Sequence, residues 1–125
     1  MGICGRLQCS QHWLLPVSYT HLIRTGIVLL ATEEENIIGI LGAGIRPHVF
    51  NKSVLSCHEF IWYVTPEHQK SGLGVALIER ADNLRQLRGC VSFQMMRLDN
   101  SSPYLDKVFL TLGFEPSEHC WTKVN

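Results

Sequence analysis

The chain has 125 residues and a mass of 14.2 kDa, which is enough for one domain and too little for two. Its 46% hydrophobic and 18% charged residues exclude disordered, collagen-like and coiled-coil chains. Eleven Lys and Arg balance eleven Asp and Glu, so the basic character needed for sequence-independent nucleic-acid binding is missing. No apolar run approaches the roughly 18 residues of a membrane span. We therefore expect neither nucleic-acid nor membrane partners.

The cysteines are odd in number and widely spaced, which argues against a disulfide framework. They are Cys4, Cys9, Cys57, Cys90 and Cys120. Without a secretory leader, this usage predicts reduced thiols and a cytoplasmic protein. Cys4, Cys9 and His12 have the look of a zinc half-site, but a closed site needs a fourth ligand and usually tighter spacing. We expect no metal.

Residues 1–25 show no sustained hydrophobic period, and residues 17–22 resemble a translated sequencing adaptor. We interpret residues 1–25 as an irregular leader, either non-native or the remnant of an N-terminal region. Residues 26–125 then form a single domain.

The domain opens with strand patterns. Two apolar runs at 27–31 and 37–45 flank an acidic turn at 33–36, which predicts a hairpin. A polar stretch at 46–56 predicts a loop. The aromatic and β-branched run at 59–64 predicts the strongest strand of the chain.

Helical periodicity follows, with apolar residues at steps of three and four from Leu73 to Leu87 and a C-terminal stop at Gly89. A strand at 90–96, a second helix at 104–112 and a closing strand at 119–124 complete the prediction. The order β-β-β-α-β-α-β predicts an α+β fold, a mixed α/β three-layer sandwich with an antiparallel start.

The segment between the strongest strand and the longest helix carries the chemistry. The first amides of a helix lack intrahelical partners, and Gly72 and Gly74 would let an anion approach them. Lys70 and Gln69 add a cation and a donor, so the segment predicts a phosphate cradle. Gly-x-Gly alone is more typical of an ordinary loop before a helix than of a phosphate site, and the P-loop pattern is absent.

The longer pattern resembles the acyl-CoA-binding motif of the GNAT acetyltransferase superfamily: a strand ending in Val64, then Pro66, then Gln69-x-x-Gly72-x-Gly74 and an amphipathic helix. Two further motifs agree with this resemblance, namely the family's Gly-Phe signature at Leu112–Phe114 and an ending like that of small phage and bacterial members at Glu118–Lys123. The resemblance implies the GNAT fold and transfer of an acetyl group from acetyl-CoA to an amine. The acceptor, a small molecule or a peptide, stays open.

By this resemblance, backbone groups of residues 62–64 bind pantetheine and amides of residues 69–74 hold the pyrophosphate. Ser102 stands where many members have an asparagine that bonds pantetheine. The implied cofactor-binding residues are Trp62, Tyr63, Val64, Gln69, Lys70, Ser71, Gly72, Leu73, Gly74 and Ser102.

His58 and Glu59 are the candidate bases. Only about one alkylamine in a few thousand is neutral at pH 7, so a base or a water relay would help the reaction. In a regular strand, His58 shares a face with Trp62 and Val64 while Glu59 lies opposite. A β-bulge would invert this assignment. The alternative for either residue is a polar side chain facing solvent at a strand edge.

Two departures from the family favour another interpretation, a catalytically weak or inactive acyl-CoA-binding module. Phe109 stands where many members have the tyrosine that protonates the thiolate. Residues 1–25 are too few for the usual first strand and two helices, and the resulting open sheet edge predicts a homodimer. Acyl chemistry through Cys57 is disfavoured, since its neighbour His58 would point to the other face.

Overall fold

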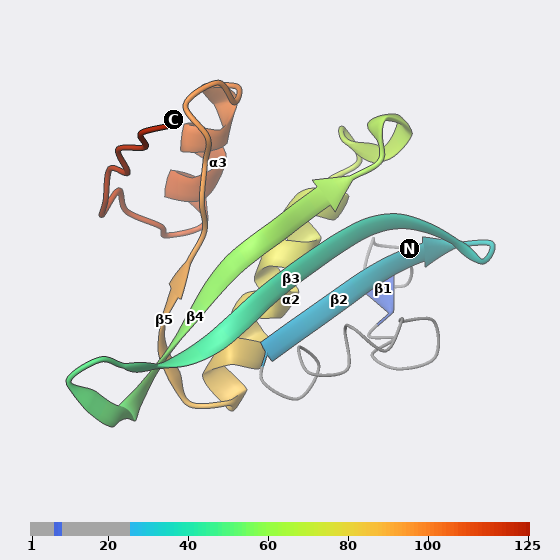
Figure 1. Cartoon of the computed structure of the whole chain (residues 1–125). Helices are drawn as coiled ribbons and strands as arrows, with labels where there is room; N and C mark the ends of the chain where they lie inside the picture. Colours follow the sequence, from blue (N-terminus) through green and yellow to red (C-terminus); the bar gives the residue numbers. More distant parts are fainter. Residues whose placement is uncertain (1–6, 9–25) are drawn as a thin grey trace.

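The computed structural model describes residues 7–8 and 26–125, the side chains from residue 26 onward (Figure 1). Within these residues, five strands form one sheet in the order β1-β2-β3-β4-β5. They are β1 (Leu7–Gln8), β2 (Gly26–Glu33), β3 (Asn36–His48), β4 (Asn51–Val64) and β5 (Cys90–Gln94). The helical elements of the described residues are the 3₁₀ turn η3 (Pro66–His68), α2 (Leu73–Leu87) and α3 (Tyr104–Thr111). β1 to β4 pair antiparallel and β5 pairs parallel to β4, so the sheet is mixed, as an α+β fold requires.

The predicted first hairpin is confirmed. Residues 27–31 are buried on both faces of the sheet, which explains an apolar run without alternation. The two turn residues, Glu34 and Glu35, have φ of 50° and 71°, the pattern of a two-residue turn that matches the twist of the strands. Within the leader, Leu7 pairs with Ala31 and Gln8 with Leu30, so β1 covers these two residues of the β2 edge.

The loop predicted at 46–56 is wrong. β3 continues to His48 and β4 begins at Asn51, so only Val49 and Phe50 turn the chain. This end of the hairpin is largely exposed, so its side chains lack the alternation that marks a half-buried strand. Pro47 lies next to a register irregularity, a position where a strand tolerates proline.

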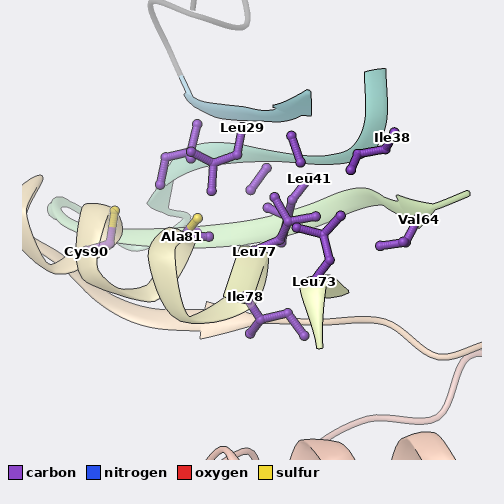
Figure 2. Packing of buried hydrophobic residues seen from close by; sticks show 13 residues of the cluster. Leu29, Ile38, Leu41, Val64, Leu73, Leu77, Ile78, Ala81 and Cys90 are labelled. Carbon is purple, nitrogen blue, oxygen red and sulfur yellow. The ribbon is translucent and has the colours of Figure 1, made fainter. Parts of the chain in front are cut away.

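Helix α2 covers one face of the sheet and builds the core (Figure 2). Leu73, Leu77 and Ala81 are at most 2% exposed and pack in one cluster with Leu29 and Leu41 of the sheet. The predicted helix is confirmed with its C-terminal Gly89, whose φ of 79° favours glycine. Leu87 departs from the predicted apolar stripe, because its side chain is 83% exposed.

β5 ends at Gln94, two residues before the predicted end, and the chain then runs to α3. The predicted closing strand at 119–124 is wrong: residues 114–125 form neither helix nor strand, and Trp121 is 95% exposed. A strand needs a backbone partner, and the sheet ladder of the described residues includes none for this segment. Among the described residues, no helix is long and apolar enough to cross a membrane.

Candidate functional site

The site begins where β4 and β5 separate. Their parallel pairing runs from Leu55 opposite Cys90 to His58 opposite Gln94, where β5 ends. β4 continues to Val64, while the chain after β5 turns away toward α3 (Figure 1). The backbone edge of residues 59–64 that faces away from β3 is therefore not paired with β5. In open sheets, ligands bind where neighbouring strands part at their carboxyl ends.

A β-bulge lies in this same stretch of β4. Ala43 of β3 pairs with Glu59, and the next pair is Gly42 with Ile61, so Phe60 is an extra residue. A bulge shifts the alternation of side chains by one residue and increases the local twist.

The bulge decides which side chains share a face. Glu59 pairs with Ala43, a core residue under α2, and therefore points to the α2 face together with Trp62 and Val64. His58 points to the opposite face. The arrangement expected for a regular strand is thus wrong, and the inverted arrangement is the one present.

Glu59 lies at the point of separation and is buried, with 8% exposure. Met96 N, on the segment after β5, donates to Glu59 Oε2 at 3.3 Å. Burial raises the pKa of Glu59 above its ordinary value, and the Met96 bond opposes part of the rise. Sequence reasoning missed Met96, because a backbone donor leaves no signal in the residue type. On the other face, His58 Nε2 lies 3.0 Å from Ser56 Oγ.

The polar backbone groups beyond the bulge alternate in direction. Thr65 N donates to Ile38 O of β3, so Tyr63 also directs its backbone toward β3. The backbone N–H and C=O groups of Trp62 and Val64 therefore point to the other edge of β4, which β5 leaves unpaired. Val64 O accepts a bond from Gln69 Nε2 at 3.0 Å, which engages this glutamine with the strand end.

Helix α2 starts at the end of this edge. Gly72 precedes it with a φ of 82°, a left-handed conformation that favours glycine. The first helical bond joins Ala76 N to Gly72 O, and Leu73 N donates to Ser71 Oγ at 3.3 Å. No acidic residue lies in the first turn. The remaining first-turn amides and the positive end of the helix dipole suit an anion.

The close packing of Trp62 explains why position 74 is a glycine. Trp62 Nε1 donates to Gly74 O at 3.1 Å, and a Cβ at Gly74 would lie 3.1 Å from Trp62 Cζ2. The glycine therefore lets the indole of β4 rest on the first turn of α2.

A family model described as an acetyltransferase (GNAT) domain matches residues 24–116. The chain belongs to the GNAT acetyltransferase family. A search of curated proteins finds no match.

Solved GNAT structures share the fold. A Trypanosoma brucei acetyltransferase has a TM-score of 0.71 at 19% identity, covering 86% of this chain and 73% of its own. The aminoglycoside N-acetyltransferase AAC(6')-Iy in complex with CoA has a TM-score of 0.69 at 19% identity, and the match covers 84% of this chain and 81% of the neighbour's chain. An aminoglycoside acetyltransferase from an uncultured soil metagenomic sample has a TM-score of 0.69 at 22% identity, and the match covers 89% of this chain and 76% of the neighbour's chain.

In this GNAT domain, the loop before α2 is tied to the first hairpin through His68. His68 Nδ1 lies 2.9 Å from Thr65 Oγ1, and His68 Nε2 lies 3.5 Å from Glu33 Oε1 at the end of β2. His68 O accepts bonds from Ser71 N at 3.1 Å and from Ser71 Oγ at 2.6 Å. Sequence reasoning missed this role of His68, since its partner Glu33 is distant in sequence. Lys70 of the same loop is exposed.

The remaining predicted site residues lie on α3 of the GNAT domain or just before it. Ser102 is exposed, and its Oγ accepts a bond from Tyr104 N at 3.2 Å at the start of the helix. The Phe109 ring lies 5.8 Å from the Trp62 ring and 5.8 Å from the Phe114 ring. This aromatic cluster joins α3 to β4 across the separation.

The buried cysteines are unsuited to nucleophilic chemistry. Burial raises the pKa of Cys57 to about 12 and also raises the pKa of Cys90. Cys4, Cys9 and His12 lie outside the described residues. Within residues 26–125, no group of three or more His, Cys, Asp or Glu side chains is arranged to hold a metal ion.

Proposed function

We propose that this GNAT domain transfers an acetyl group from acetyl-CoA to an amine. The observation that carries the proposal is the separation of β4 from β5 beyond His58 and Gln94, which leaves a polar backbone edge leading to the start of α2. An elongated ligand with amide groups at one end and a diphosphate at the other matches this sequence of donors and acceptors.

The residues present fit acetyl-CoA in two places. The backbone groups of Trp62 and the N–H of Val64, which point away from β3, would bond the amides of the pantetheine. The first-turn amides of α2, next to Gly72 and the exposed Lys70, would hold the pyrophosphate. Gln69 acts indirectly, because its side chain fixes the end of β4 at Val64 O.

Glu59 is the residue we assign to proton removal. Its carboxyl group lies at the separation of the strands and has a raised pKa, which makes it a better base than an ordinary carboxylate. Acetyl-CoA supplies the thioester carbon, so the amine N–C bond forms as the C–S bond breaks. The amine proton passes to Glu59, and water protonates the thiolate. His58, on the opposite face, is the alternative base.

The cradle is tested by calorimetry with acetyl-CoA on the full chain and on Gly72→Glu. The matched control is Gly89→Glu, because Gly89 has a similar φ of 79° at the other end of α2. We expect Gly72→Glu to abolish binding, because its carboxylate would repel the pyrophosphate at the start of α2. Gly89→Glu should retain binding, because it introduces a similar backbone strain away from the cradle. Equal binding by the two variants would overturn the assignment.

Phe109 favours a second candidate function, an acyl-CoA-binding module with weak or no turnover. Its ring packs between Trp62 and Phe114 and carries no hydroxyl to protonate a leaving thiolate. Release of the CoA thiol in the presence of a broad amine panel separates the two functions. Binding of acetyl-CoA without any amine-dependent release would support the module.

A further inference from the structure

The chain between β5 and α3 supplies the hydrogen-bond donor of Glu59, although no strand pairing holds this segment. Residues 95–103 form neither helix nor strand. Met96 N in this segment donates to Glu59 Oε2 at 3.3 Å, close to where β4 and β5 separate. A donor of this kind keeps its aim only when the surrounding residues are themselves fixed. The direction of the Met96 N–H therefore depends on contacts other than the sheet ladder.

Arg97, the residue after Met96, makes such contacts. Its Nε lies 2.7 Å from Asp106 Oδ1 in the first turn of α3. Its Nη1 donates to Leu98 O at 3.2 Å and to Ser101 O at 3.5 Å. The guanidinium carries its donors in a rigid fork, so one side chain can hold several acceptors in a set arrangement. Arg97 thereby joins the turn after β5 to the start of α3.

Helix α3, which carries Asp106, is itself packed against the sheet. The Phe109 ring of this helix lies 5.8 Å from the Trp62 ring of β4. This contact docks α3 on the same strand that carries Glu59. Asp106 is therefore a fixed anchor, and Arg97 fastens the segment after β5 to it.

The other elements packed against Glu59 present apolar side chains to it. Ala43 of β3 pairs with Glu59. The buried residues of α2 are Leu73, Leu77, Ile78 and Ala81. The charged residues of α2 are exposed or half-buried, and they are Glu79, Arg80, Asp82 and Arg85. His58 points to the opposite face of β4, and Cys90 lies at the other end of β5. Within the described part of the chain, the Met96 N–H is thus the polar group that meets the Glu59 carboxyl.

Two opposing effects act on the protonation of Glu59. Burial raises its pKa, and the bond from Met96 lowers it. The guanidinium of Arg97 pairs with Asp106 rather than with Glu59, so Arg97 acts on the carboxyl through the position of Met96. Loss of the Met96 bond would leave burial unopposed, and Glu59 would then stay protonated to higher pH.

We propose that Arg97 is a positioning residue for acetyl transfer: paired with Asp106, it holds the backbone N–H of Met96 on the carboxyl group of Glu59. The inference rests on the proposed function and adds the residues that keep its base in place. Arg97 acts through Met96 and not on the reacting atoms.

The test compares the pH profile of kcat/KM for the full chain and for Arg97→Ala, with the amine of the panel that releases CoA fastest. A carboxylate base must be ionised to act, so the profile rises through the pKa of Glu59. We expect Arg97→Ala and Asp106→Asn to move this rise to higher pH. Near neutral pH, kcat/KM should fall by roughly three- to tenfold, the effect of one hydrogen bond, with little change at alkaline pH. Both variants should fold, because a partly exposed ion pair contributes little to stability.

Arg85→Ala is the matched control. Arg85 Nε lies 2.7 Å from Asp82 Oδ1, and its Nη1 donates to Cys90 O at 3.1 Å, so it also joins a carboxylate and a carbonyl, at the far end of β5. Its loss should leave the pH profile in place. Arg97→Lys should retain more of the wild-type profile than Arg97→Ala, since an ammonium group can still pair with Asp106. An equal shift in Arg85→Ala, or no advantage of lysine over alanine at position 97, would overturn the inference.

Two NMR measurements test the inference without turnover. Arg97→Ala should raise the hydrogen-exchange rate of the Met96 amide by roughly three- to tenfold. It should also move the titration of the Glu59 side-chain carbon to higher pH, and Glu59→Gln identifies that resonance. A wild-type chain that binds acetyl-CoA without releasing CoA would count against the proposed function, and these two measurements would still decide the role of Arg97. Normal turnover with both measurements unchanged in Arg97→Ala would reject the inference alone.

Discussion

Trp62 Nε1 donates a hydrogen bond to Gly74 O at 3.1 Å, which fixes the edge of β4 to the first turn of α2. The two parts of the proposed acetyl-CoA site, one from a strand and one from a helix, therefore hold a set relative position. The contact depends on a glycine, because the indole lies where a side chain at position 74 would be.

Gly74→Val should separate these two parts. Overpacking against Trp62 should lower the free energy of unfolding by about 1–3 kcal/mol and weaken acetyl-CoA binding. Urea denaturation and calorimetry measure the two effects. Gly44→Val is the control, because a Cβ at Gly44 meets no atom within 4 Å. A similar loss in both variants would refute the role of the Trp62 contact.

His68→Ala should weaken binding of CoA by roughly three- to tenfold, because each lost side-chain hydrogen bond is worth about 1 kcal/mol. Pantetheine lacks the diphosphate, so its binding should not change. Calorimetry with both ligands measures the difference. His48→Ala is the control. It removes a different histidine hydrogen bond, the one that Phe50 N donates to His48 Nδ1 at the hairpin turn, and should bind CoA normally. Equal loss for pantetheine would mean a general structural defect.

Glu59→Gln should stabilise the protein at pH 7 and have no such effect near pH 3. Below the pKa of the unfolded chain, about 4.3, Glu59 is protonated in both states and costs nothing. As the pH rises, the unfolded state ionises first because burial raises the folded pKa, so wild-type stability falls. Urea denaturation across this pH range measures the change. Glu79→Gln, at an exposed position of α2, is the control.

The same Glu59→Gln substitution should slow acetyl transfer more at neutral than at alkaline pH. At high pH the amine is already neutral, so a base contributes less to the rate. The pH profile of kcat/KM measures this effect, with His58→Asn as the comparison on the opposite face of β4. A loss confined to His58→Asn would transfer the role of base to the histidine.

Phe109→Tyr should raise kcat if thiolate protonation limits the reaction, because it introduces a hydroxyl on the helix next to Trp62. Phe93→Tyr is the control, since Phe93 contacts Phe114 in the same aromatic cluster but belongs to β5. Thiol release under saturating amine measures kcat. An equal rise in both variants would indicate a change in packing rather than proton donation.

The local elements follow closely from the sequence. The helical stripe that starts at Leu73 and the stop at Gly89 depend on residues within one or two turns of the helix, and the apolar run at 27–31 is a short continuous segment typical of a buried strand. Gly72 and Gly74 were placed correctly at the start of α2, although Gly74 serves the packing of Trp62.

The two wrong predictions of secondary structure concern segments whose structure depends on pairing with distant segments. The stretch 46–56 forms strands because β3 and β4 pair along their length, and 119–124 forms none although its pattern is strand-like. Side-chain pattern alone does not say whether a backbone finds a partner.

The sequence by itself determined the family motif, the two helices, the first hairpin and which residue types surround the candidate site. Only the tertiary structure decided that Phe60 is a bulge, and hence that Glu59 points to the α2 face and His58 away from it. It also decided where β5 leaves β4 and that His68 meets Glu33. Register is a relation between strands, and one extra residue in one strand reverses every face beyond it.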